Sequence, residues 1–220
     1  MARRLEGGRK MIKKNWKVLL VTSIMILLPI LVGLILWDQL PEQMPTHWNE
    51  SGEVDGWSSK SFAIFGLPLI MLALQWICFL GTGADPKKEN HPPKVLHLVL
   101  WIIPALSLLL HAVTYAVALG KDVRMEMIMP IVIGLVFAII GNYLPKCQQN
   151  YTIGIKIPWT LNSEENWNRT HRFAGKLWTV SGLVIMLTGF FGGFGIFLGV
   201  VILMVFAPFI YSYLLHRKGV

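Results

Sequence analysis

The chain has 220 residues, of which 54% are hydrophobic and only 15% are charged, and its mean hydropathy is +0.56. This composition excludes an ordinary soluble domain. The formal net charge of +8 does not indicate direct nucleic-acid binding, because the basic residues gather in short segments between long apolar stretches. We therefore expect a multi-pass membrane protein.

Six apolar stretches approach the roughly 20 residues that a membrane-spanning helix needs. They cover residues 18–37, 61–83, 95–119, 127–144, 174–191 and 196–215. Five of them contain a proline, whose lost backbone hydrogen bond neighbouring helices can replace. The predicted fold is an all-α polytopic membrane protein with six transmembrane helices.

The division of Lys and Arg residues predicts the orientation of these helices. If the chain crosses the membrane six times, 17 of the 20 lie in segments on one side, and Lys60, Lys121 and Arg124 lie on the other. The positive-inside rule then places both termini in the cytoplasm, where the basic segments contact anionic lipid. We expect a basic tail (1–17), four spans with an outer loop (18–144), and an inner loop with two spans (145–220). Met11 is an alternative natural start, which would make residues 1–10 an extension.

Residues 38–60 form the predicted outer loop, which is acidic and rich in tryptophan. Residues 49–52 are a typical turn, and the flanking PTHW and EVDGW sequences can pair as a short hairpin. The loop is interpreted either as a folded cap at the headgroup boundary or as a ligand-binding surface. No metal site is expected, because one His among scattered carboxylates lacks ligand spacing. The candidate ligand-binding residues are His47, Trp48, Asn49, Asp55 and Trp57.

Two further patterns in the spans predict packing. His97 and His111 share one helix face, and we expect neutral, hydrogen-bonded roles for them, with Gln75 as the partner for either. Two GxxxG patterns, at residues 189–193 and 195–199, predict close packing of the last two helices.

Residues 145–173 form the predicted inner loop, which ends in an amphipathic helix lying in the membrane interface. Ser163 is well placed as the N-cap of a helix that begins at Glu164. On that helix Trp167 and His171 fall on one side, and the basic side chains fall on the opposite side.

The two loops also resemble known families. The outer loop is similar to a bacterial membrane domain of unknown function in its Leu-Pro, Pro-x-His-Trp-Asn, Gly-x-x-Asp-Gly and Ser-Lys positions. The inner loop resembles the SdpI family in its Gly-Asn (141–142), Pro-Trp-Thr-Leu (158–161) and Thr-His-Arg (170–172) sequences. Lys156 stands where that family usually has Arg, which keeps the charge but loses the planar fork of a guanidinium group.

The resemblance implies a function. Members of the SdpI family are immunity proteins of the bacterial cytoplasmic membrane that resist a secreted sporulation-delaying killing peptide. The resemblance therefore implies two partners: a peptide toxin at the outer loop and a cytoplasmic repressor captured at the inner loop. It also implies no enzymatic activity and no cofactor. The residues expected at the inner dock are Asn150, Lys156, Pro158, Trp159, Thr160, Trp167, Arg169, His171 and Arg172.

Two alternatives stay open: a small-solute or peptide transporter, and a membrane-embedded enzyme. An ion-coupled transporter usually carries acidic residues inside its spans, and the six apolar stretches contain none. An enzyme needs a catalytic constellation on one side of the membrane, whereas His47 is expected outside and His171 and His216 inside.

Overall fold

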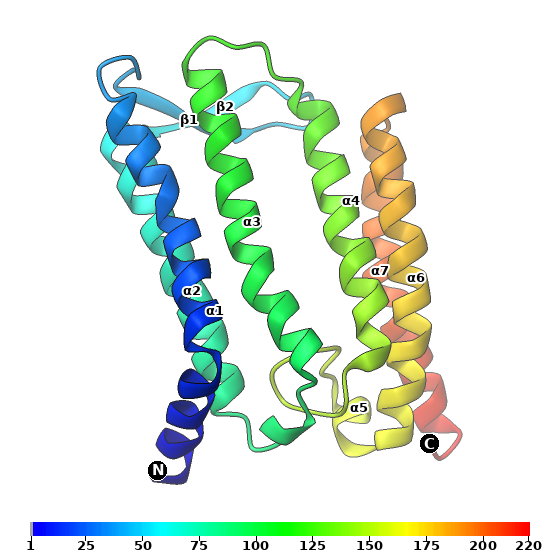
Figure 1. Cartoon of the computed structure of the whole chain (residues 1–220). Coiled ribbons are helices and arrows are strands. Elements are labelled where there is room, and N and C mark those ends of the chain that lie inside the picture. The colour runs from blue at the N-terminus through cyan, green and yellow to red at the C-terminus, as the bar shows by residue number, and fades with distance from the viewer. Residues whose placement is uncertain (1) are drawn as a thin grey trace. The chain divides into compact units, whose positions relative to one another are not determined.

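The structure, a computed structural model, describes the backbone of residues 2–220 and the side chains of residues 11–220. Side chains 1–10 of the predicted basic tail lie outside this description. Within it, six helices have the length and hydropathy of a membrane span, so the prediction of a six-helix membrane protein is confirmed. They are α1 (Ala2–Ile35), α2 (Leu67–Gly83), α3 (Pro93–Ala118), α4 (Met125–Tyr143), α6 (Glu164–Phe191) and α7 (Phe194–Arg217) (Figure 1).

The chain divides into two compact units. The first comprises Met1–Ala84 and His97–Met125, and the second comprises Asp85–Leu96 and Glu126–Val220. The first unit also contains strands β1 (Gln43–Trp48) and β2 (Val54–Ser59) and the π-helical turn η1 (Phe62–Gly66). The second also contains the 3₁₀ turns η2 (Lys88–Asn90) and η3 (Leu144–Lys146) and the short helix α5 (Pro158–Asn162).

Strands β1 and β2 pair antiparallel, so the predicted hairpin is confirmed. Its turn is closed by a hydrogen bond of 3.0 Å from the Gly52 N–H to the Asn49 carbonyl oxygen. Gly52 has a φ of 81°, a conformation that glycine adopts without strain. The buried Lys60 fixes the far end, because its ammonium group contacts the Trp37 carbonyl oxygen and the Glu42 carboxylate.

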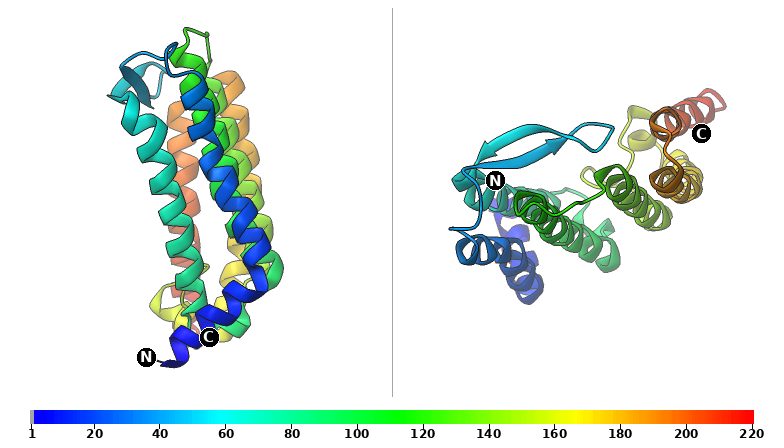
Figure 2. Two further views of the ribbon diagram at one scale, coloured as in Figure 1. Left: turned by 60° about the vertical axis from the view of Figure 1, so that its left-hand side comes forward. Right: turned by 90° about the horizontal axis from the view of Figure 1, so that it is seen from above.

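Helices α1 and α2 of the first unit lie side by side (Figure 2). Met44, Ile64 and Tyr115 belong to a buried cluster that joins the hairpin to η1 and α3. The Tyr115 hydroxyl donates to the Pro29 carbonyl oxygen at 2.9 Å. This hydrogen bond joins α3 to α1 at the proline of α1.

Buried polar residues of the first unit pair differently from the expectation. Gln75 donates from Nε2 to the Thr22 hydroxyl at 2.9 Å, so it pairs with neither histidine. His111 places Nδ1 2.7 Å from the Ser107 carbonyl oxygen, one turn earlier in the same helix. His97 is exposed on α3.

Glycines bring α4 and α6 into backbone contact in the second unit. A Cβ added at Gly182 would lie 2.4 Å from the Gly134 carbonyl oxygen, and one added at Gly141 would lie 2.9 Å from that of Gly175. A Cβ at Gly189 would lie 2.6 Å from the carbonyl oxygen of Met127. These glycines recur every seven residues, and the sequence interpretation missed this seam.

Helix α7 is joined to α6 by Gly192 and Gly193, which both have positive φ. Helices α6 and α7 lie side by side, as predicted, but the 195–199 pattern does not form the contact, because a Cβ at Gly195 or Gly199 would meet no atom within 4 Å. The Trp178 indole instead donates to the Met204 carbonyl oxygen at 3.0 Å. That oxygen has no helical partner, since Pro208 has no N–H.

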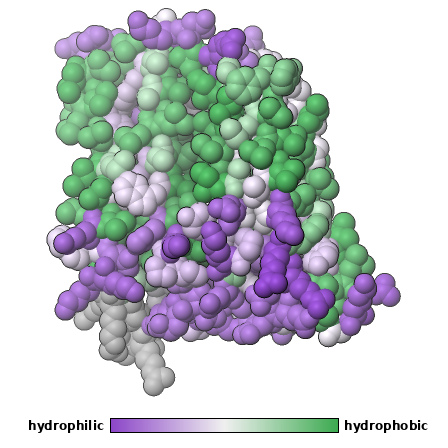
Figure 3. Space-filling model, turned by 45° about the vertical axis from the view of Figure 1, so that its right-hand side comes forward, coloured by the Kyte–Doolittle hydropathy of each residue, from purple (hydrophilic) through white to green (hydrophobic). Residues whose placement is uncertain are grey.

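The face drawn in Figure 3 shows hydrophobic side chains along the middle of the helices and hydrophilic side chains at their ends. Exposed apolar residues such as Leu183 and Phe206 are more than half accessible. A surface of this kind is stable in lipid and unstable in water.

Candidate functional site

Residues 147–157, here the α4–α6 loop, fold around the side chain of Asn150. The Asn150 amide nitrogen donates to the carbonyl oxygens of Gln148 and Ile153 at 2.8 and 2.9 Å. Its oxygen accepts from the N–H groups of Thr152 and Ile153 at 2.9 and 2.7 Å. Asn150 is 1% exposed, so its role is to satisfy loop backbone groups.

Trp167 and His171 hold the same loop from α6. Their rings stack with centroids 4.0 Å apart, and the Trp167 indole donates to the Cys147 carbonyl oxygen at 2.7 Å. His171 Nε2 accepts from the Ile155 N–H at 2.9 Å, so the proton of the neutral ring lies on Nδ1, which donates to the Trp167 carbonyl oxygen. The two side chains thus face the loop, and Trp167 also packs against Val95 at the start of α3.

Gly154 makes this contact possible. Its φ is 122°, and an added Cβ would lie 2.5 Å from His171 Nε2 and 3.0 Å from the Trp167 ring. Only glycine fits both the backbone conformation and the space above the two stacked rings.

A second segment, residues 85–95, clamps the loop from the other side, and sequence reasoning did not select it. The buried Asp85 carboxylate accepts from the Tyr151 N–H and the Thr152 hydroxyl, both at 2.9 Å, and from the Lys87 N–H at 2.8 Å. Burial raises the pKa of Asp85, but these hydrogen bonds outweigh it and leave the pKa below its usual value.

His91 completes this cluster. Its Nε2 lies 3.3 Å from the Asp85 carboxylate and 3.2 Å from the Thr152 hydroxyl. Burial lowers the pKa of His91 despite the neighbouring carboxylate. Near neutral pH the cluster therefore holds an ionised Asp85 and a neutral His91.

Gln149 links the clamp segment to α5. Its amide nitrogen donates to the carbonyl oxygens of Thr160 and Leu161 at 2.8 and 2.9 Å, at the end of α5. The Asn90 side chain donates to the Gln149 backbone oxygen at 2.7 Å, and Lys87 donates to the Gln149 side chain. Beneath them Val95, Cys147 and Trp167 form one buried cluster. Burial raises the pKa of the Cys147 thiol to about 11, so it stays protonated and unreactive.

The Pro-Trp-Thr sequence forms the start of α5. Pro158 occupies the first helical turn, where its missing N–H costs nothing. The buried Thr160 hydroxyl accepts from the Ile157 N–H at 3.1 Å and donates to the Ile155 carbonyl oxygen at 2.7 Å. Trp159 instead packs against α7: its ring meets Phe209 edge-on with centroids 5.1 Å apart and stacks on His216 with centroids 6.0 Å apart.

Helix α6 begins at Glu164, as predicted, and the Ser163 hydroxyl caps it by accepting from the Asn166 N–H at 3.1 Å. It continues unbroken to Phe191, so the amphipathic stretch is the first part of a span rather than a separate interfacial helix. On its polar face Arg169 pairs with Glu165, and Arg172 is exposed.

Seven of the nine predicted inner-loop residues separate into two groups, and the other two, Pro158 and Trp159, begin α5. Asn150, Thr160, Trp167 and His171 are buried and hold the loop together. Exposed positive charge comes from Lys156, Arg169 and Arg172.

The hairpin is a candidate surface of its own, in the first unit. His47 Nδ1 contacts the Asp55 carboxylate across the two strands. Asn49 serves the turn, because its side-chain oxygen accepts from the N–H groups of Ser51 and Glu53. Trp48 is half-buried, whereas Trp57 is 57% exposed. The hairpin therefore presents one exposed aromatic ring and an exposed His–Asp pair.

This combination defines a class of protein: a multi-pass helical membrane protein with a folded hairpin and a rigid loop outside its spans. Residues 146–212 match the SdpI/YfhL protein family, and residues 24–72 match a domain of unknown function, DUF1648. The chain is 30% identical over 195 residues to "Immunity protein SdpI" of Bacillus subtilis (strain 168), covering 89% of this chain and 90% of that protein. No solved structure matches it.

The chain belongs to the SdpI family. Both resemblances recognised in its loops are confirmed, and it is a multi-pass protein of the bacterial cytoplasmic membrane.

Proposed function

We propose that this chain is an immunity protein that protects its cell from a secreted, membrane-active killing peptide. The observation that carries the proposal is the similarity to an immunity protein across nine tenths of both chains, which includes the hairpin and the α4–α6 loop. In the proposed orientation the hairpin faces outward, and the α4–α6 loop and both termini face the cytoplasm.

The charge and shape of the hairpin region support capture of a peptide. Residues 38–60 contain five acidic residues and one basic residue, Lys60, which is buried. Such a field attracts a cationic peptide and raises the encounter rate more than the affinity. Trp57 supplies an exposed aromatic side chain, the kind that dominates binding energy at interfaces.

Binding of the sporulation-delaying killing peptide to the purified full-length protein in lipid nanodiscs tests this role. Trp57→Ala should weaken binding roughly tenfold or more. Ser59→Ala, at another exposed position of β2, is the matched control and should bind as the native protein does. Equal affinity of the native protein and Trp57→Ala would remove the hairpin from recognition.

We further propose that the exposed basic face near the start of α6 docks a cytoplasmic repressor. Arg172 is exposed, and the Arg169–Glu165 pair is half exposed, so neither arginine holds the fold together. The buried residues of the loop keep this face in a fixed position. A basic surface beside a folded loop favours an acidic partner, and binding then orders side chains but no backbone segment.

Reversing the charges of Arg169 and Arg172 distinguishes a role in binding the repressor from a role in holding the fold. Arg169→Glu with Arg172→Glu should abolish repressor capture while leaving peptide resistance and membrane level unchanged. Arg217→Glu with Lys218→Glu, at the end of α7, is the matched reversal and should leave all three unchanged. Parallel loss of resistance, capture and protein level in the first variant would identify the arginines as structural instead.

The one His–Asp–hydroxyl cluster found among the described side chains favours this reading over an enzyme. In a catalytic triad the acid and the nucleophile contact different nitrogens of the histidine. Here both Asp85 and Thr152 contact Nε2 of His91. The cluster is arranged to hold a loop in place.

A further inference from the structure

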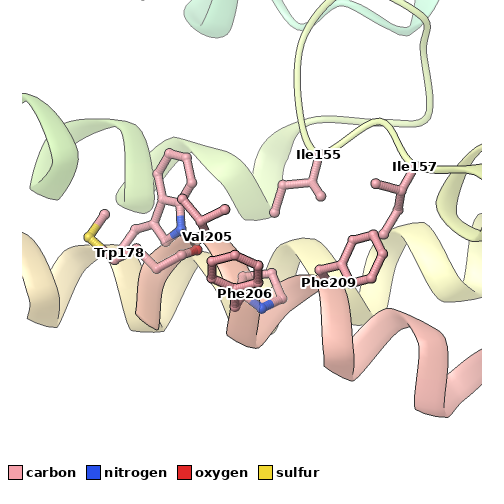
Figure 4. A pocket seen from close by; sticks show the side chains of 8 residues that line it. Ile155, Ile157, Trp178, Val205, Phe206 and Phe209 are labelled. Atoms are coloured by element: carbon pink, nitrogen blue, oxygen red, sulfur yellow. Dashed lines mark hydrogen bonds between the residues drawn. The ribbon is translucent and has the colours of Figure 1, made fainter. Parts of the chain in front are cut away.

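An apolar pocket of about 320 Å³ lies where the α4–α6 loop approaches α7. Figure 4 shows Ile155 and Ile157 reaching from the loop toward Phe206 and Phe209. Trp178 of α6 and further residues of α7 complete the lining. The volume is in the range of small-ligand sites.

The lining has no free hydrogen-bonding group to offer. Its only side-chain donor is the Trp178 indole N–H, which is already bonded to the Met204 carbonyl oxygen. Pro208 carries no N–H. A polar solute or a peptide backbone would therefore lose its hydrogen bonds to water here without replacement. The part of a ligand that enters this pocket must be a hydrocarbon chain.

The charges beside the pocket are positive. Lys156 stands between the two lining isoleucines and is exposed, and its ammonium group uses one of three N–H donors on the Thr152 carbonyl oxygen. From residue 142 to residue 220 the only acidic residues are Glu164 and Glu165. This charge balance favours an anionic headgroup.

The depth of the pocket fits a lipid. Phe209 lies eight residues before the end of α7 at Arg217, which corresponds to about 12 Å along the helix. The interfacial layer of one leaflet is about 5–8 Å thick, so a pocket at this depth lies among the acyl chains when the phosphates lie at the level of the helix end.

We propose that this pocket binds one acyl chain of an anionic phospholipid, with Lys156 as the partner of its phosphate group. The acyl chain of the lipid fills the space between the α4–α6 loop and α7 and holds Ile155 and Ile157 in place. The site is distinct from the general lipid shell, because a loop closes one of its walls.

Native mass spectrometry of the full-length protein, purified with equal amounts of phosphatidylglycerol and phosphatidylcholine of one chain length, tests this site. The native protein should retain one phosphatidylglycerol. Val205→Trp fills the pocket and should lower retention at least fivefold, whereas Ile202→Trp, an exposed α7 position outside the lining, should not. Lys156→Gln should keep a lipid but lose the preference for phosphatidylglycerol, and Lys218→Gln should keep both.

Three results would overturn the proposal. The first is native-like retention by Val205→Trp, and the second is an unchanged headgroup preference in Lys156→Gln. The third is a native dimer that retains no lipid and dissociates in Val205→Trp, which would assign the pocket to a second copy of the chain. Because Lys156 is exposed and lies outside α7, the second comparison does not depend on the tolerance of α7 for tryptophan.

Discussion

At the scale of single residues, the α4–α6 loop is held by buried polar side chains that each satisfy several backbone groups. Asn150 makes four hydrogen bonds to backbone groups of the loop, and Asp85 accepts two more from the loop, from the Tyr151 N–H and the Thr152 hydroxyl. Burial of a polar group is unfavourable unless it is paired. If one partner is removed, the other stays buried without a hydrogen bond and its desolvation penalty is no longer offset. We therefore expect the loop to be rigid and sensitive to substitution.

Gly154→Ala tests this rigidity at its tightest point. The added Cβ has to displace the His171 and Trp167 rings and adopt a φ of 122°, so we expect a loss of about 1–3 kcal/mol of stability. Gly120→Ala is the control, because Gly120 also has a positive φ, 76°, but open space around it. Thermal unfolding in detergent measures both. Equal destabilisation of the two variants would show that the rings do not confine the loop.

His91 predicts how the loop responds to pH. Its pKa in the folded state is below 6.5, so the closed loop is most stable above about pH 6.5 and loses stability as the pH falls through the folded pKa. The pKa of Asp85 is also lowered, from 3.8, so that carboxylate stays ionised down to more acidic pH. Hydrogen exchange at Tyr151, corrected for intrinsic rates, should therefore be faster at pH 5.5 than at pH 7.5.

In His91→Gln this difference should disappear, because the glutamine amide does not titrate. An unchanged pH dependence in the variant would assign the effect to another group.

At the scale of elements, the second unit depends on the glycine seam between α4 and α6. Small residues let two membrane helices approach until their backbones touch. Gly134, Gly141, Gly175 and Gly182 occupy this seam, whereas Gly195 and Gly199 on α7 face open space. The contribution of a glycine to helix packing thus depends on whether another helix lies against it.

Gly182→Leu should destabilise the protein by about 1–3 kcal/mol or more, because its side chain enters space filled by the Gly134 carbonyl oxygen and Ala138. Gly199→Leu should change stability little, since nothing lies near that position. Melting temperatures in the same detergent compare the two variants. A larger effect at Gly199 would place the tight contact on α7 instead.

Local patterns predicted the elements well. Hydropathy located the six spans, the Asn49–Gly52 turn predicted the hairpin, and Ser163 predicted the start of α6. These features depend on residues that are neighbours in the chain. Asp85 and His91 were missed because their partners lie about sixty residues away, and no local pattern records such a contact. The glycine seam was missed because its seven-residue spacing is shared between two helices, whereas the GxxxG patterns in one segment were more conspicuous.

At the scale of the whole molecule, the account depends on the orientation of six spans. Cysteine labelling from outside should modify Ser51→Cys in the hairpin turn and spare Asn162→Cys at the end of α5, in a background without Cys78 and Cys147. Asn162 is chosen because it is exposed, whereas its neighbour Ser163 caps α6. Both sites should react after permeabilisation. Labelling of Asn162→Cys alone in intact cells would reverse the proposed outer and inner faces.

The central claim is that this member of the SdpI family confers immunity. Its most direct test is the survival of cells that lack their own immunity protein, express this chain at a measured membrane level, and are exposed to the sporulation-delaying killing peptide. We predict survival with the native chain and with Ser59→Ala, and killing with Trp57→Ala at equal protein level. Killing of cells that contain the native chain in the membrane at the level of a protective family member would contradict the account.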